Sequence, residues 1–437
     1  MVTLIVCACL VGLAAPAAHA AAGPVALVAW GDMGTKQQGV PTGLSDVTAI
    51  SAGGDFGLVL ETGGTVIAWG GDGQDTGFVP PGLTDVTAIS AAADYSVVLK
   101  ANGTVVAWGT DERGQVDVPA GLANVTAISA GDHHSLAVRS DGTVTGWGDD
   151  SDGGLDVPPG LGNVVAVEAG SGQSMALRSD GTAAAWGANT YGQGTVPAGL
   201  ANVTAISAGY GFDLALKSDG TVVAWGRDDT GQTAVPAGLN HVVAISAGWG
   251  SSLALKDDGT VVAWGRLYPT YQGGFPMTPP DGLDHVAAIA AGGSDSIALV
   301  GGAATPLTTV SCDWLPCSPG VDYRGAQLDL IPHATAGSPV TRTVYTLDGT
   351  DPATSPTAVT YNRMGLTVTS TATLKFASID QAGHAEPTRS LFIGAVQDTV
   401  PPVTAVHCDA APCGTVAYPK PVSVSLTATD TGGSGVV

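Results

Sequence analysis

Short runs that alternate apolar with small or polar residues recur throughout residues 24–300, and turn signals separate them. In one unit, "VTAIS" at 125–129 precedes "HSLAV" at 134–138, then Asp-Gly, then "TVTGWG" at 143–148. Alternation with a period of two predicts β-strands, and an Asp-Gly pair between two such runs predicts a two-residue hairpin with positive φ at both residues. A fourth, short strand is expected near each Val-Pro pair, because proline suits an outer edge. Each unit therefore predicts about four antiparallel strands.

A Trp-Gly pair ends the third strand of every unit, at a constant spacing of 39 residues. The tryptophans are Trp30, Trp69, Trp108, Trp147, Trp186, Trp225 and Trp264. A fixed period of this size predicts a repeat architecture, and four short strands per repeat are typical of one β-propeller blade. We expect these tryptophans to pack between neighbouring blades, in a structural and not a catalytic role.

The two ends of the repeat region complement each other. The first Trp-Gly strand has no "AISAG"-type strand before it, and the last unit, ending in "SIALV" at 296–300, has no Trp-Gly strand after it. Residues 24–31, "PVALVAWG", would supply the missing strand and remove two exposed sheet edges. We therefore predict an all-β chain with a seven-bladed β-propeller over residues 21–303, closed by its N-terminal strand.

The repeated "DGTVVAWG" and "AISAG" segments resemble the regulator-of-chromosome-condensation repeat family, whose members form seven-bladed propellers. The units look closest to secreted bacterial members such as the propeller-type β-lactamase inhibitor proteins. This resemblance implies a binding protein that uses aromatic loop residues on one face. The nucleotide-exchange and chromatin activities of the family's founding nuclear protein are not expected here, because the chain is acidic and has no basic tail.

The 39-residue period stops after residue 303. "YTLDGTDP" at 345–352 and "ASIDQAGH" at 377–384 resemble the C-terminal immunoglobulin-like domain of chitobiases and β-hexosaminidases, which implies a β-sandwich over residues 304–400. Cys312 and Cys408 are 96 residues apart, as are Cys317 and Cys413. Residues 401–437 are therefore expected to begin a second, truncated copy of the sandwich.

Composition narrows the classes of partner. The chain has 437 residues, 12% of them charged, and a net charge of −23, which disfavours nucleic acids and anionic membrane surfaces. The apolar run "LIVCACLVGLAA" at 4–15 followed by "AHA" predicts a signal peptide over residues 1–20 and no membrane insertion. The mature protein is thus expected to be secreted, either extracellular or on the cell surface. In that oxidising setting the two CxxxxC pairs predict the disulfides Cys312–Cys317 and Cys408–Cys413, with a four-thiolate zinc site as the alternative.

Candidate binding residues lie in the loops that differ from unit to unit. The loop after "AISAG" and the loop after Trp-Gly are expected on the same face of the propeller, and large aromatic residues there are suited to a protein interface. The predicted partner-binding residues are Tyr191, Tyr210, Trp249, Tyr268, Tyr271 and Phe275, with Asp228 and Asp229 as an acidic rim. Four residues one position after the variable loop, Phe56, Tyr95, His134 and Phe212, are instead expected to be blade residues with some burial.

The remaining candidates are assigned to turns and solvated loops. "DDSDGGLD" at 149–156 resembles a calcium loop, but Leu161 stands where the bidentate glutamate would be, so we expect no metal site. His241 and His285 occupy a turn position that other units fill with Asn or Asp. No hydrolase or metalloprotease motif is present. We therefore predict a non-enzymatic protein-binding scaffold without cofactors. The alternative is a carbohydrate-directed accessory module of a larger secreted enzyme or adhesin. A third hypothesis is an enzyme with its site in the central pit of the propeller.

Overall fold

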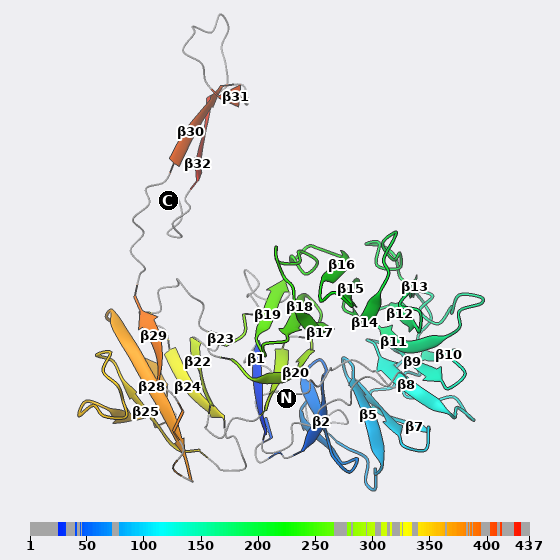
Figure 1. The fold of residues 1–437 in the computed structure, drawn as a ribbon, viewed down its shortest axis with the longest axis horizontal. Helices are drawn as coiled ribbons and strands as arrows, with labels where there is room; N and C mark the ends of the chain where they lie inside the picture. Colours follow the sequence, from blue (N-terminus) through cyan, green and yellow to red (C-terminus); the bar gives the residue numbers. More distant parts are fainter. Residues whose placement is uncertain are drawn as a thin grey trace, which may run out of the picture.

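The computed structural model describes residues 25–31, 40–41, 44, 46–71, 78–265, 278–280, 283–293, 295–301, 307–312, 315–316, 324–325, 327–333, 340–362, 365–381, 383, 385–386, 388–394, 403–408, 411–412 and 424–429. Within these ranges the regular elements are all β-strands, and no helix is present that could cross a membrane. The N-terminal two-thirds forms three-stranded antiparallel sheets that follow one another around a common centre (Figure 1). This arrangement is a β-propeller.

The sheets follow the repeats in the sequence. They are β2 (Val47–Ala52), β3 (Phe56–Glu61) and β4 (Val66–Gly70); β5 (Val86–Ala91), β6 (Tyr95–Lys100) and β7 (Val105–Gly109); β8 (Val125–Ala130), β9 (His134–Arg139) and β10 (Val144–Gly148); β11 (Val164–Ala169), β12 (Gln173–Arg178) and β13 (Ala183–Gly187); β14 (Val203–Ala208), β15 (Phe212–Lys217) and β16 (Val222–Gly226); β17 (Val242–Ala247), β18 (Ser251–Lys256) and β19 (Val261–Gly265); and β20 (Val286–Ala291), β21 (Asp295–Gly301) and β1 (Val25–Gly31).

One residue in the left-handed region precedes the first strand of every sheet. These residues are Asp46, Asp85, Asn124, Asn163, Asn202, His241 and His285, with φ between 53° and 59°. Asn, Asp and His are the non-glycine residues that adopt this conformation most readily. His241 and His285 are thus turn residues, as their position in the repeat indicates.

The hairpin prediction was wrong in its turn type. At the Asp-Gly pair of 141–142 only Gly142 has positive φ, at 76°. The N–H of Gly142 donates to the Arg139 carbonyl at 2.8 Å, and the N–H of Arg139 donates to Thr143 at 2.9 Å, which makes a three-residue loop with its glycine in the left-handed region. Asp141 does not need positive φ, because its Oδ1 accepts the N–H of Thr143 at 3.0 Å and the hydroxyl of Thr143 at 2.6 Å.

The predicted fourth strand near each Val-Pro pair is also absent from the described parts of the propeller. At 116–122, the Val118 N–H donates to the Val116 carbonyl at 2.9 Å, and the Leu122 N–H donates to Pro119 at 3.1 Å. These local turns use backbone groups that a fourth strand would need for its ladder. The proline was taken to indicate an edge strand, but the segment that contains it forms turns.

The repeated tryptophans pack between neighbouring sheets, as predicted. Trp147 on β10 is 5% exposed and lies in one cluster with Tyr95 and Val97 of the preceding sheet. Its indole N–H donates at 2.9 Å to the carbonyl of Gln115, in the loop after the preceding Trp-Gly strand. Equivalent bonds join Trp186 to Gly154, Trp225 to Gln193 and Trp264 to Gln232.

Serine hydroxyls on the innermost strands link one sheet to the next. Ser129 Oγ accepts the backbone N–H of Ala169 at 2.9 Å, and Ser90 Oγ accepts that of Ala130 at 3.0 Å. The same contact is made by Ser51 with Ala91, Ser207 with Ala247 and Ser246 with Ala291. One repeat has Glu168 in place of this serine; burial raises its pKa, and the backbone of Ala208 lowers it in part. We call this set of side chains the acceptor belt; it explains why "AISAG" repeats so closely.

The N-terminal strand β1 pairs antiparallel with β21 along its whole length, Val25 opposite Gly301 and Gly31 opposite Asp295. It is the third strand of the sheet that holds β20. Val25 and Leu27 share a hydrophobic cluster with Val47 and Ile50 of the first complete repeat.

Beyond residue 301 the strands form two four-stranded antiparallel sheets. The first contains β22 (Leu307–Cys312), β23 (Leu315–Pro316), β24 (Gln327–His333) and β27 (Leu366–Thr367); the second contains β25 (Val340–Thr346), β26 (Val359–Thr360), β28 (Ala372–Asp380) and β29 (Arg389–Ile393). Leu328 and Leu330 of the first share a buried cluster with Leu374 and Phe376 of the second. The immunoglobulin-like assignment and its chitobiase likeness stay predictions.

A last sheet contains β30 (Val403–Cys408), β31 (Ala411–Pro412) and β32 (Val424–Thr429). Cys317 and Cys413, and the side chains of Cys312 and Cys408, lie outside the described residues. Both disulfides, the signal peptide and the truncated second copy therefore stay predictions.

Candidate functional site

Backbone hydrogen bonds between neighbouring loops fix the positions from which the variable side chains project. The N–H of Tyr210 donates to the carbonyl of Gly248 in the next repeat at 3.2 Å, and the N–H of Trp249 donates to Gly292 at 3.3 Å. Asp132 makes the same contact with Gly170 at 3.1 Å. In these repeats the residue after "AG" is thus held to the following sheet by its backbone, and its side chain is free to vary.

Three predicted aromatic residues lie together, and one arginine lies against two of them. The rings of Tyr210 and Trp249 have centroids 6.4 Å apart, and the guanidinium carbon of Arg227 lies 5.1 Å from the Tyr191 ring centroid and 5.5 Å from that of Tyr210. Tyr191, Tyr210 and Trp249 are 51%, 42% and 40% exposed. We call these four residues the aromatic patch. Sequence reasoning found its aromatic members and missed Arg227, which directly follows a Trp-Gly pair, as Arg266 does in the next repeat.

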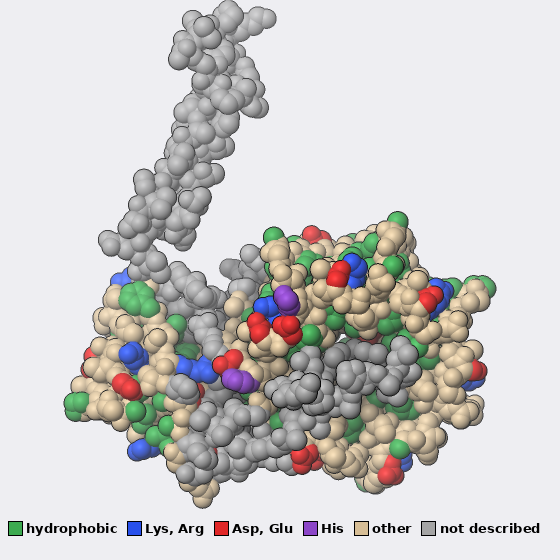
Figure 2. All heavy atoms as spheres, in the orientation of Figure 1, with side chains coloured by type: hydrophobic (Ala, Val, Ile, Leu, Met, Phe, Trp, Pro, Cys, Tyr) green, Lys and Arg blue, Asp and Glu red, His purple; other side chains and the backbone are tan. Residues whose placement is uncertain are grey.

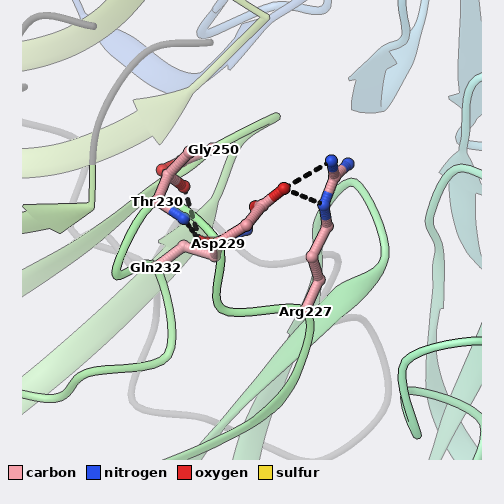
Figure 3. Close-up of polar contacts among 5 residues, drawn as sticks. All are labelled: Arg227, Asp229, Thr230, Gln232 and Gly250. Atoms are coloured by element: carbon pink, nitrogen blue, oxygen red, sulfur yellow. Dashed lines mark hydrogen bonds and ion pairs between the residues drawn. The ribbon is translucent and has the colours of Figure 1, made fainter. Parts of the chain in front are cut away.

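Arg227 is oriented by the loop that follows it (Figure 3). Its Nε and Nη2 donate to Asp229 Oδ2 at 2.9 and 2.6 Å. Gln232 in turn donates to Asp229 Oδ1 at 3.2 Å, and Gln232 is itself buried and accepts the Thr230 N–H at 2.9 Å. Asp229 therefore holds the arginine that lies against the two tyrosines, a more specific task than the acidic rim we predicted.

Asp228 has a loop-forming contact. Its Oδ1 accepts the N–H of Thr233 at 3.0 Å, and Asp150 and Asn189 make the equivalent bonds to Leu155 and Gly194 in their repeats. The side chain is exposed. Its part in partner binding stays a prediction, as do those of Tyr268, Tyr271 and Phe275, which lie outside the described residues.

A polar groove of about 450 Å³ borders the aromatic patch. Tyr191, Tyr210 and Arg227 line one side, and Arg113 and Asp149, which form an ion pair, line the other. Asp149, the first carboxylate of the acidic loop at 149–156, is thus paired with Arg113. Within the described residues no group of three or more His, Cys, Asp or Glu side chains is placed to hold a metal ion.

The residues assigned to the blades are buried more completely than expected. Phe56, Tyr95, His134 and Phe212 are each 2% exposed or less. Burial lowers the pKa of His134 to about 4, and its Nε2 lies 2.9 Å from the Ser174 hydroxyl. This histidine is a neutral structural residue beneath the groove.

The mouth of the central channel entered the sequence analysis only as a possible enzyme site in the central pit, and the residues that line it were not predicted. It is a hollow of about 80 Å³, lined mainly by the repeated Ala and Gly residues, with Asp132, Tyr210 and Trp249 as its large side chains. Burial raises the pKa of Asp132, and the nearby Trp249 lowers it in part. The sequence did contain a signal, because Asp132 occupies the position after "AG" that Tyr210 and Trp249 occupy in later repeats. Figure 2 shows that charged side chains are sparse on the face in view.

Comparison with known proteins supports the repeat and the fold. The sequence profile of the regulator of chromosome condensation (RCC1) repeat matches residues 125–153, 164–193, 203–232 and 242–266. Prp20p from Saccharomyces cerevisiae, studied for its binding to Gsp1p and histones, superposes with a TM-score of 0.54 at 18% identity, over 64% of this chain and 93% of that one. A structure of Kap60 bound to yeast RCC1 (Prp20) gives 0.53 at 19% identity, over 70% and 94%. No curated protein sequence matches. The chain thus carries RCC1 repeats and has the fold of an RCC1-type propeller.

Proposed function

We propose that this RCC1-repeat chain is a secreted, non-enzymatic binding protein that meets a protein partner through the aromatic patch. The observation that carries the proposal is the contiguous patch in which Arg227 lies against the rings of Tyr191 and Tyr210, and Tyr210 contacts Trp249. Tyr, Trp and Arg dominate the binding energy of protein interfaces. All three rings are 40% or more exposed, on a scaffold whose loops are fixed by backbone hydrogen bonds. Prp20p, whose fold this chain shares, binds proteins.

The finer parts of the proposal rest on the sequence. The propeller has seven blades closed by β1, lies within residues 21–303, and works like the propeller-type β-lactamase inhibitor proteins, by presenting loop aromatics to a target. The immunoglobulin-like segment of 304–400 acts as a spacer. The pairing of β1 with β21 and the hydrogen bond from the Gly293 N–H to Gly53 at 3.0 Å support closure.

A carbohydrate-directed accessory role is the second candidate, supported by the groove beside the patch. Its tyrosine rings and its many polar side chains are of the kinds that contact sugar rings and hydroxyls. The two candidates differ in ligand class. A glycan array probed with the wild-type chain and with Tyr191→Ala tests the carbohydrate role.

The protein-partner proposal is tested by capture from the extracellular fraction of the source. Wild type, Trp249→Ala and Tyr210→Ala serve as baits, and Phe392→Ala serves as the matched control because Phe392 is a 49% exposed aromatic on β29. We expect one protein to be retained by wild type and by the control, and lost from both patch variants. Equal retention by all four baits, each with an unchanged thermal melt, would rule out the patch as the binding surface.

A further inference from the structure

We propose that Asp213 keeps a proton at neutral pH and donates it in a hydrogen bond to the carbonyl of Gln193, and that loss of this proton loosens the loop that carries Tyr191. Partner binding by the aromatic patch therefore weakens as pH rises. This inference rests on the proposed protein-binding function and adds a regulation of the same site. Its structural part is tested without a partner, so the two can fail independently.

A pair of donors recurs between neighbouring sheets. In the middle strand of a sheet, one serine lies opposite the tryptophan of the third strand, as Ser174 lies opposite Trp186. Both side chains donate to one backbone carbonyl in the loop of the preceding repeat, which for this pair is that of Gly154, at 2.7 and 2.8 Å. The same arrangement joins Ser135 and Trp147 to Gln115, and Ser252 and Trp264 to Gln232.

One sheet has a carboxyl group where its two neighbours have this hydroxyl. Asp213 on β15 lies opposite Trp225, whose indole donates to the Gln193 carbonyl at 3.1 Å. Asp213 is fully buried, and its Oδ1 accepts the Nε2–H of Gln173 at 3.3 Å. Its Oδ2 lacks a hydrogen-bond partner in the described part of the chain. An ionised carboxylate has only acceptors, so the protonated acid alone can replace the serine donor. The repeat pattern therefore indicates a proton on Oδ2 that is shared with the Gln193 carbonyl.

The surroundings of Asp213 favour the neutral acid. Burial is the largest cause that raises its pKa well above the ordinary range; Gln173 lowers it in part, and the Glu168 carboxyl raises it further. Glu168 belongs to β11 of the preceding sheet. Arg227, the cation of the neighbouring loop, donates to Asp229 at 2.9 and 2.6 Å. An ionised Asp213 would be a buried charge facing a carbonyl oxygen, which is unfavourable.

The loop that contains Gln193 carries a member of the aromatic patch. The buried Gln193 side chain accepts the backbone N–H of Tyr191 at 2.8 Å, and its carbonyl is held by Trp225 of the next sheet. As pH rises through the pKa of Asp213, one donor at this carbonyl is replaced by a negative charge. The loop is then held less firmly, and Tyr191 loses its fixed position against Arg227. A partner must then order the ring on binding, which costs affinity.

NMR on the full chain between pH 5 and 10 tests the proton and its acceptor. The carboxyl carbon of Asp213 is identified by its absence in Asp213→Asn. We expect the chemical shift of a protonated carboxyl at pH 7, and the indole N–H resonance of Trp225 should move with the same midpoint because both groups bind one carbonyl. The indole N–H of Trp186, whose fellow donor is Ser174, is the matched control and should not move. A carboxylate at pH 7, no titration by pH 10, or a Trp225 resonance that does not follow Asp213 would overturn the inference.

Variants of the chain test the regulation. Asp213→Asn supplies a permanent N–H donor for Gln193 and keeps an oxygen for Gln173. Both chains carry Glu168→Gln, which removes the other buried acid. The dissociation constant of the captured partner should rise at least threefold across the Asp213 midpoint, and Asp213→Asn should abolish this rise.

Asp213→Ser, which restores the residue of the neighbouring sheets, is the second variant in case the first fails to fold. An equal rise in the dissociation constant with and without the substitution would overturn the regulation. Failure to capture any partner would contradict the proposed function, while the NMR result for the proton would stand by itself.

Discussion

The ring of Trp249 lies against that of Tyr210 in the preceding repeat, with centroids 6.4 Å apart and an angle of 59° between the ring planes. The tryptophan is 40% exposed, yet this contact and the backbone hydrogen bond from its N–H to Gly292 restrain it. A side chain that is already ordered loses little conformational entropy on binding. Trp249 is therefore suited to anchor a partner, and its contribution to folding should be small.

Trp249→Ala should weaken partner binding by more than about 1 kcal/mol, the usual threshold for an interface residue with a large effect. The melting temperature should stay almost unchanged, because the side chain is exposed and outside the core clusters. Titration calorimetry with the captured partner and a thermal melt measure the two effects. If the variant unfolds, Trp249 belongs to the core and the patch loses its main anchor.

Trp147→Ala should destabilise the propeller by about 3–5 kcal/mol, the range for truncating a buried large aromatic side chain. Trp147→Phe keeps most of the packing and removes the N–H that donates to Gln115, so its cost should include about 1 kcal/mol for that hydrogen bond. Chemical denaturation measures both, with Tyr191→Ala as the exposed aromatic control. A cost for Trp147→Ala no larger than that of the control would contradict the packing role of the repeated tryptophans.

Glu168 should make stability depend on pH. Burial raises its pKa from 4.5 to about 8. The folded chain therefore holds this proton more tightly than the unfolded chain, and stability declines as pH rises from about 4.5 through about 8. Glu168→Gln carries no titratable group, so its melting temperature should fall less than that of wild type between pH 5 and 9. Parallel melting profiles for the two proteins would show that Glu168 titrates normally.

Deletion of residues 25–31 should remove β1 and leave β21 with an unpaired edge and exposed apolar side chains. We expect aggregation or a large loss of melting temperature, since unpaired strands associate with other chains. A chain that starts at residue 21 is the control. A deletion variant that melts with its parent would refute the closure of the ring by β1.

Asp228→Asn should slow association with a basic partner, and the effect should shrink at high salt because screening shortens the range of the charge. Asparagine retains an oxygen for the Thr233 N–H, so the loop should keep its form. Stopped-flow association at two ionic strengths is the measurement. An unchanged association rate at low salt would show that Asp228 is not part of the acidic rim of the binding site.

The sequence was most informative where a residue repeats for a packing reason. The 39-residue spacing of the tryptophans predicted sheets packed side by side, and it placed Tyr210 and Trp249 in adjacent loops. It misassigned the Asp-Gly turn, because the side-chain bond from Asp141 to Thr143 replaces a conformation that the dipeptide usually signals. It could not reveal Arg227 between two tyrosines. Tyr191 belongs to the preceding repeat, so its distance from Arg227 depends on how neighbouring sheets pack.

The acceptor belt has one position without a side-chain oxygen, and this has a thermodynamic consequence. At the junction between the sheet of β20 and that of β2, the belt position is Ala290. This junction lacks the serine hydrogen bond that links other neighbouring sheets, and we therefore expect it to open first. Amide protons of β1 and β20 should exchange with deuterium before those of the opposite sheets. The order of unfolding would thus be set by a single missing hydroxyl.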